Sequence, residues 1–136
     1  MLLVLDTNVY IHAFTTTKKP ACKTLITLLA TSPSKYKLRI PRMIVEEVRR
    51  NIVPEVFREF LEFILELTNL DEDIFVPFEL GAKYEAKGLK PSDAFIAAFT
   101  EWVGADVLVT ENRHFLSCHL GLPFKVLTAE KCLNLI

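Results

Sequence analysis

Polar side chains that could bind a ligand follow two apolar segments with the character of strands buried on both faces. They are Asp6, Thr7 and Asn8 after residues 2–5, and Thr110, Glu111 and Asn112 after residues 107–109. In an open parallel sheet, ligands bind beyond the carboxyl ends of the strands. The two groups therefore predict one site, although helix capping or a turn explains either group taken alone equally well.

Two further acids accompany these groups in the sequence. Asp93 opens a helical segment in which Ser92 is the expected N-cap, and the helix dipole favours a carboxylate there. Glu46 and Glu47 share a short helical segment, where pairing of Glu46 with Arg50 would explain one of the two glutamates. The apolar neighbours leave little of the helix surface exposed to solvent for the second glutamate. Glu47 is therefore the better candidate for a site.

Converging carboxylates repel one another, so folding them together costs stability unless a cation lies between them. Asp6, Glu47 and Asp93 each adjoin apolar core sequence, which favours such a convergence. An all-oxygen site of this kind suits Mg²⁺ or Mn²⁺ better than zinc. The sequence therefore predicts metal-dependent chemistry at these three acids.

Histidines and cysteines offer no competing site. The histidines are too scattered for a His-based site, so we expect them to be structural: His12, His114 and His119. The cysteines match neither a zinc ribbon nor a redox pair, so we expect buried or idle thiols: Cys22, Cys118 and Cys132.

The bulk properties predict a single domain over residues 1–136, because 136 residues with 51% hydrophobic side chains suffice for one core only. No apolar run is long enough to span a membrane and no signal peptide is evident, so we expect a soluble, cytoplasmic protein. The net charge of −1 excludes an overall basic field. Contacts with a nucleic acid must therefore be local.

Strand-like and helix-like segments alternate along the chain. The expected strands are residues 2–5, 37–40, 74–76, 107–109 and 124–127, and the expected helices are residues 20–31, 41–53, 55–70, 78–87, 92–103 and 129–136. Parallel strands need crossover connections, so this order predicts an α/β fold with a mostly parallel sheet of four to five strands and helices on both faces.

The segment 55–70 has an apolar arc of roughly 200 degrees, about twice what one core contact needs. We therefore expect a homodimer or another partner to cover part of this helix.

Three stretches of the sequence, VLDTNV, IPRMIVEEV and KPSDAFIAAFTEWVGADVLVTENRHFL, together resemble the PIN-domain family, in the same order and over nearly the whole chain. The similarity is greatest to the VapC-like toxins of bacteria and archaea. It implies a compact α/β fold and endoribonuclease activity supported by Mg²⁺ or Mn²⁺. It also implies a tendency to form dimers and an antitoxin protein as partner.

The resemblance assigns roles by position in this chain. Asp6, Glu47 and Asp93 match the family's acids, with Glu47 contributing through water, and Asn8 and Thr110 are supporting residues. Asn112 stands where an aspartate is commonest, so a second metal ion depends on its amide oxygen or on Glu111. The implied mechanism is metal-assisted hydrolysis of RNA. The nearest cations in sequence, which we expect to contact the RNA backbone, are Arg39, Arg42, Lys90 and Arg113.

Two other functions are compatible with part of this pattern. A phosphatase of the haloacid-dehalogenase type would use Asp6 as nucleophile and Thr110 to bind phosphate, but it needs a second aspartate where Asn8 stands and a lysine that is missing. A non-catalytic RNA- or partner-binding module would keep the fold and lose a metal ligand at Asn112.

Overall fold

The centre of the molecule is a five-stranded parallel sheet with the strand order β3-β2-β1-β4-β5. The computed structural model describes residues 1–15, 18–117 and 121–136. Its strands are β1 (Leu2–Leu5), β2 (Lys37–Pro41), β3 (Leu70–Asp71), β4 (Val107–Val109) and β5 (Lys125–Leu127). The predicted α/β fold with a parallel sheet is therefore confirmed.

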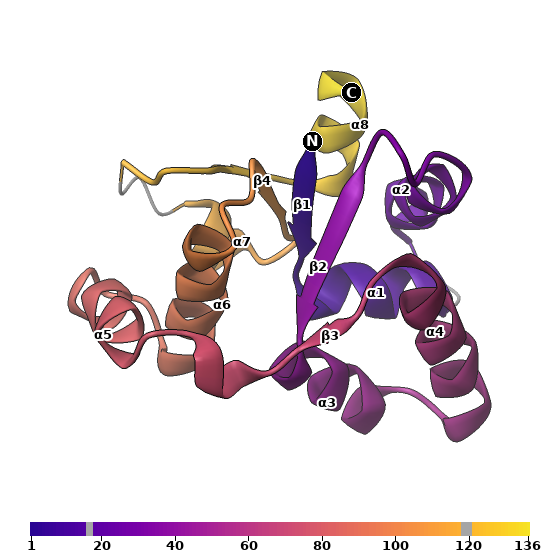
Figure 1. The fold of residues 1–136 in the computed structure, drawn as a ribbon. Coiled ribbons are helices and arrows are strands. Elements are labelled where there is room, and N and C mark those ends of the chain that lie inside the picture. Colours follow the sequence, from indigo (N-terminus) through magenta and orange to yellow (C-terminus); the bar gives the residue numbers. More distant parts are fainter. Residues whose placement is uncertain (16–17, 118–120) are drawn as a thin grey trace.

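Helices flank both faces of this sheet (Figure 1). They are α1 (Thr7–Phe14), α2 (Pro20–Thr31), α3 (Arg42–Asn51), α4 (Pro54–Leu67), α5 (Phe78–Ala86), α6 (Pro91–Trp102), α7 (Arg113–Leu116) and α8 (Ala129–Leu135), with a 3₁₀ turn η1 (Asp73–Phe75). Helices α2 and α4 lie on one side of the sheet, and α5 and α6 on the other. Among the described residues, no helix is long and apolar enough to cross a membrane.

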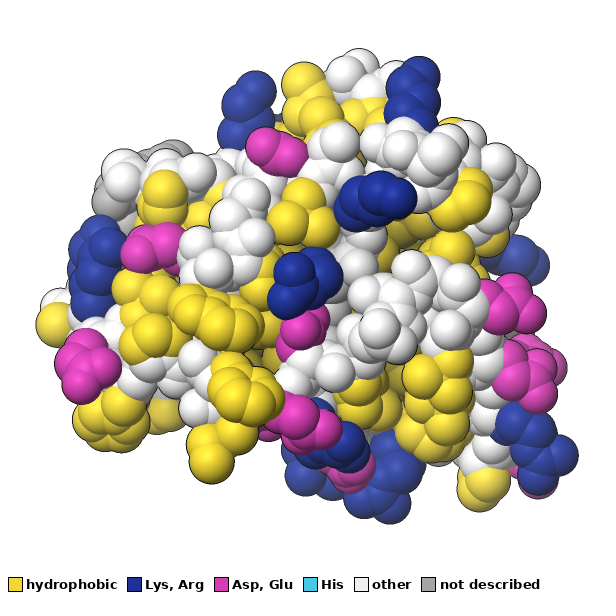
Figure 2. All heavy atoms as spheres, viewed as in Figure 1, with side chains coloured by type: hydrophobic (Ala, Val, Ile, Leu, Met, Phe, Trp, Pro, Cys, Tyr) yellow, Lys and Arg dark blue, Asp and Glu magenta, His cyan; other side chains and the backbone are white. Residues whose placement is uncertain are grey.

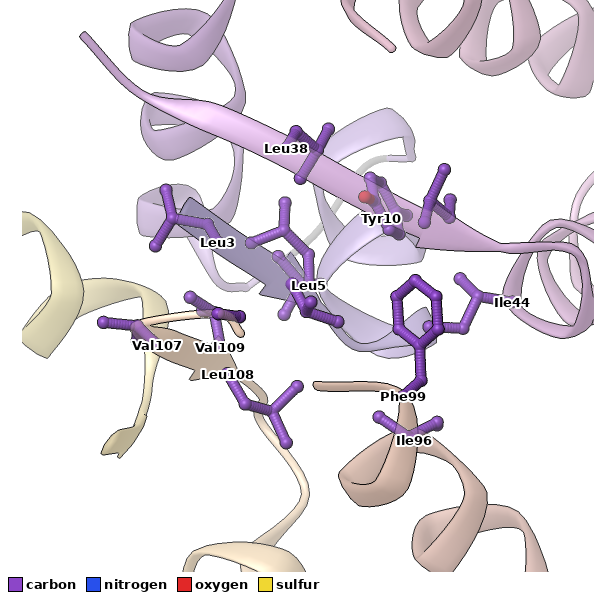
Figure 3. Packing of buried hydrophobic residues seen from close by; sticks show 14 of the residues in the cluster. Leu3, Leu5, Tyr10, Leu38, Ile44, Ile96, Phe99, Val107, Leu108 and Val109 are labelled. Atoms are coloured by element: carbon purple, nitrogen blue, oxygen red, sulfur yellow. The ribbon is translucent and has the colours of Figure 1, made fainter. Parts of the chain in front are cut away.

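The core is built around the central strand β1, whose Leu3 and Leu5 are fully buried because helices cover both faces of the sheet. Figure 3 shows buried side chains around β1, among them Phe99 of α6 and Ile44 of α3, which belong to the same hydrophobic core. The core thus ties α3 and α6, which carry two of the predicted acids, to the sheet.

Some of the predicted elements differ from the observed ones. The helix predicted over residues 55–70 ends at Leu67, and Leu70 begins β3 instead, where it pairs with Ile40 of β2. The strand predicted over residues 74–76 is the turn η1. Ser92 lies inside α6, because Pro91 already begins that helix.

The broad apolar arc of α4 is used largely inside the molecule. Phe60 and Ile64 are fully buried, and the ring of Phe60 meets Tyr10 and Phe14 edge-on at centroid distances of 5.1 and 5.7 Å. Leu65 on the outer side is 59% exposed. An aromatic cluster shared with α1 therefore explains much of the arc that the sequence assigns to a partner.

Candidate active site

Asp6 lies at the carboxyl end of the central strand and is held from three sides. Its backbone N–H donates to the carbonyl of Val109 at 2.8 Å, which continues the pairing of β1 with β4. Its Oδ1 accepts from the backbone N–H of Thr7 at 2.7 Å, and its Oδ2 accepts from the hydroxyl of Thr110 at 2.8 Å. With 6% exposure, Asp6 is a buried, fixed carboxylate that also caps α1.

The segment after β4 is tied to the start of α1 by its own hydrogen bonds. The Thr110 hydroxyl accepts from the N–H of Asn112 at 3.1 Å, and Asn8 Oδ1 accepts from the N–H of Glu111 at 3.2 Å. Asn112 Oδ1 in turn accepts from the N–H of His114 and caps α7. Asn8 therefore ties this segment to the start of α1.

Glu47 projects from α3 towards α1. Its Oε2 accepts a hydrogen bond of 2.8 Å from the hydroxyl of Thr7. Glu46 instead pairs with Arg49 at 2.6 Å, although the sequence predicted a pair with Arg50. The two neighbouring glutamates therefore differ in role, since only Glu47 is bonded to the residue that follows Asp6.

Asp93 is the third residue of α6 and is 8% exposed. Its burial raises the pKa of its carboxyl group above the ordinary value. The charges of His114 and Lys90 lower that pKa, and the charge of Glu47 raises it. His114, which the sequence predicts to be structural, lies within electrostatic reach of Asp93.

The charges of the three predicted acids act on one another. Burial raises the pKa of Asp6, and the hydrogen bonds from Thr110 and Thr7 lower it. The charges of Asp93 and Glu47 raise it further. The side chains of Asp6, Glu47 and Asp93, remote in sequence, are thus within electrostatic reach of one another, and we call these three acids the Asp6 cluster.

The donor atoms of the Asp6 cluster fit a hard divalent cation. Carboxylate oxygens are the ligands that Mg²⁺ and Mn²⁺ prefer, and a cation would relieve the repulsion among buried acids. As the side chains lie, no three His, Cys, Asp or Glu residues of the described part of the chain are grouped as a complete metal site. The fit therefore rests on the type of donor and on the repulsion.

Glu111, offered by the sequence as a replacement ligand, points elsewhere. Its Oε2 accepts from the N–H of Ala129 at 2.9 Å, and its Oε1 lies 3.4 Å from Lys19 Nζ. Its carboxylate therefore joins α2 and α8 to the end of β4.

Two of the four cations predicted to contact RNA already have carboxylate partners. Arg39 and Arg42 each donate two hydrogen bonds to an acid of residues 71–72, at 2.6 to 2.8 Å. Lys90 and Arg113 are exposed, and neither forms an ion pair within the described residues.

The predicted idle thiols are buried where the structure describes them. Cys22 and Cys132 are both free, and burial raises the pKa of each to about 11. Neither is a reactive thiolate at neutral pH. Cys118 and His119 lie outside the described residues.

Comparison with known proteins identifies the family of this fold. The family model of the PIN domain matches residues 3–118, and the chain therefore belongs to the PIN domain family. No curated protein matches the sequence.

Solved structures of the same fold cover nearly the whole chain. One is VapBC2 from Rickettsia felis bound to a DNA fragment from their promoter, with a TM-score of 0.63 and 20% identity over 93% of this chain and 97% of that one. Another is FitAcB from Neisseria gonorrhoeae, with a TM-score of 0.67 and 12% identity over 94% and 98%.

Proposed function

We propose that this PIN domain protein is an endoribonuclease that hydrolyses phosphodiester bonds in RNA with Mg²⁺ or Mn²⁺. The observation that carries the proposal is the Asp6 cluster, in which the charges of Glu47 and Asp93 raise the pKa of the buried Asp6. Uncompensated repulsion of this kind costs stability, so a fold that retains it favours a bound cation. The family match also argues against the phosphatase alternative.

Each residue of the Asp6 cluster has a distinct part in this proposal. Asp6 and Asp93 would hold the ion, with Glu47 beside them, directly or through water. When bound, the ion supplies an activated water and neutralises charge on the phosphate oxygens. Thr110 keeps Asp6 oriented through its hydroxyl, which is fully buried and therefore shielded from competing water.

Basic side chains beside the cluster would bind the RNA backbone. Lys90 is exposed at the start of α6, and its charge acts on Asp93. Arg113 opens α7, directly after the segment that bonds to Asp6. Phosphate contacts of this kind position a substrate without reading its sequence.

Partner proteins form the second half of the proposal. The resemblance to VapC-like toxins implies an antitoxin and a cytoplasmic site of action, and VapBC2 from R. felis shares this fold. A small open reading frame directly upstream would support the toxin assignment. We also propose a homodimer that uses the exposed side of α4, where Leu65 is 59% exposed.

The activity is tested with purified protein and a mixed pool of single-stranded RNA. We expect cleavage with Mn²⁺ or Mg²⁺ and none in EDTA. Asp6→Asn and Asp93→Asn should each lower the rate by on the order of 100-fold or more, since metal ligation contributes several kcal/mol to the transition state. Glu47→Gln should also be impaired, and Glu46→Gln, one residue away on the same helix, is the matched control that should retain activity.

Cleavage that survives EDTA, or that the Asp6→Asn protein retains, would contradict the proposal. A folded wild type that binds RNA and never cuts it would instead favour the binding module, for which the engagement of Asn112 Oδ1 as a helix cap is the supporting observation.

A further inference from the structure

Thr7 contacts two acids of the Asp6 cluster through two different groups. Its backbone N–H donates to Asp6 Oδ1 at 2.7 Å, and its hydroxyl donates to Glu47 Oε2 at 2.8 Å. The residue is 7% exposed, so water competes little for either bond. It thus links the end of β1 to α3.

Only one of these two bonds depends on the identity of the side chain. Any residue other than proline offers a backbone N–H to Asp6, whereas the bond to Glu47 needs a hydroxyl. A hydroxyl has a single proton to donate, and at Thr7 that proton is directed to Glu47. The branched Cβ of threonine also restricts χ1, which fixes the direction of the bond.

Glu47 needs such a tether because its surroundings act against its position. Its charge raises the pKa of both Asp6 and Asp93, which means that the three carboxylates repel one another. Glu47 is only partly buried and has a flexible side chain, so it could turn to water without a bond that holds it. The Thr7 hydroxyl donates a hydrogen bond to this carboxylate.

We propose that Thr7 is a positioning residue that holds the Glu47 carboxylate on the side of Asp6 and so favours the binding of a cation by the Asp6 cluster. The inference rests on the proposed metal-dependent function. It differs from a purely structural role, in which Thr7 only fills space at the start of α1.

A double-mutant cycle separates these two roles. Manganese affinity is measured by titration calorimetry on the full chain for wild type, Thr7→Val, Thr7→Ser, Glu47→Ala and Thr7→Val with Glu47→Ala. Thr7→Val removes the hydroxyl at nearly constant shape and should weaken Mn²⁺ binding on the order of 10-fold, as loss of a ligand's hydrogen-bond partner typically does. Thr7→Ser restores the donor and should bind within about 3-fold of wild type. In the Glu47→Ala background, Thr7→Val should have no further effect.

Unfolding by urea in EDTA gives a second readout that needs no metal. The Thr7 and Glu47 substitutions should be non-additive there, because they remove the same bond. If the effects of the Thr7 and Glu47 substitutions are additive in both measurements, or if wild type and Thr7→Val bind Mn²⁺ equally well, the inference about Thr7 is wrong. The proposed function is not affected by that result. A wild type that binds no Mn²⁺ overturns the proposed function and this inference together.

Discussion

The hydroxyl of Thr110 donates a hydrogen bond of 2.8 Å to Asp6 Oδ2, joining two residues 104 positions apart in the chain. Both residues follow neighbouring parallel strands, whose register places Leu5 opposite Val109. The bond lowers the pKa of Asp6, against the larger effect of its burial. It therefore stabilises the charged form of an acid that the fold otherwise makes costly to ionise.

We predict that Thr110→Val destabilises the protein by about 1–3 kcal/mol at neutral pH, because a buried carboxylate oxygen loses its donor. Thr110→Ser should recover most of this loss. Thr100→Val is the matched control, since its equally buried hydroxyl donates only to the carbonyl of Ile96 within α6 and should cost less. Urea unfolding in EDTA measures all three variants, and equal losses at the two threonines would contradict the prediction.

Asp93→Asn should make the metal-free protein more stable, or at least no less stable, at neutral pH. Burial raises the pKa of Asp93 above its ordinary value of 3.8, so the folded state holds that proton more tightly than the unfolded state. Asp93 therefore contributes to the stability of the folded state below pH 3.8, and this contribution is lost as the pH rises through the pKa that Asp93 has in the folded protein. The advantage of Asp93→Asn should therefore be small at pH 3.8 and grow above it.

Melting curves in EDTA between pH 3.5 and 7 test the sign, and added Mn²⁺ should stabilise the variant far less than the wild type. Glu79→Gln is the control, because Glu79 is an exposed acid in the first turn of α5 and its loss should cost about 0.3–1 kcal/mol. An Asp93→Asn protein that also melts lower, gains fully from Mn²⁺ and still cuts RNA would reduce Asp93 to a helix-dipole role.

Two buried tyrosines should respond oppositely to loss of the hydroxyl. Tyr10 Oη is buried in the core without a hydrogen-bond partner among the described residues, and Figure 3 shows the side chain of Tyr10 among the packed core residues. Tyr84 is equally buried and donates to Glu101 at 2.6 Å. Tyr10→Phe should be neutral or stabilising, whereas Tyr84→Phe should cost about 1.5–3 kcal/mol, as loss of a bond to a charged group does. Thermal melting of both variants suffices, and a marked loss at Tyr10 would show that its hydroxyl is satisfied.

Self-association should depend on the outer side of α4. We expect light scattering to show a dimer at micromolar concentration and a monomer for Leu65→Glu, because a charge would be buried in an apolar interface. The comparison variant is Phe78→Glu in α5. Figure 2 shows hydrophobic side chains gathered over that region, where Ile74 and Phe78 are 88% and 85% exposed. Dissociation by Phe78→Glu and not by Leu65→Glu would move the interface to α5.

The sequence predicts the elements whose apolar pattern is local and strong. Residues 107–109 were expected as a buried strand and form β4, and the candidate acids Asp6 and Asp93 do lie directly after a strand and near a helix start, as the sequence predicts. The two-residue strand β3 carries no such pattern. It was missed because pairing with Ile40 and Pro41, rather than its own composition, defines it.

Contacts between remote residues explain what the sequence could not predict at the site. No local pattern shows that Thr7 would bond to Glu47, that Glu111 would turn to Ala129, or that Arg39 would pair with Asp71. Each of these depends on the packing of elements that are far apart in the chain. The residue types at the site limit which side chains could form a hydrogen bond or an ion pair, but they do not determine which pair forms.

The ion pairs Arg39–Asp71 and Arg42–Glu72 also affect the tendency of the protein to aggregate at high concentration. Strand β3 forms one border of the sheet and offers only two residues to an incoming strand. Asp71 and Glu72 there are bound to Arg39 and Arg42. An incoming strand would meet these charges over a very short length, and short, charged borders of this kind discourage edge-to-edge aggregation. The opposite border, β5, is three residues long and begins with the exposed Lys125, so both open sides of the sheet resist uncontrolled strand addition.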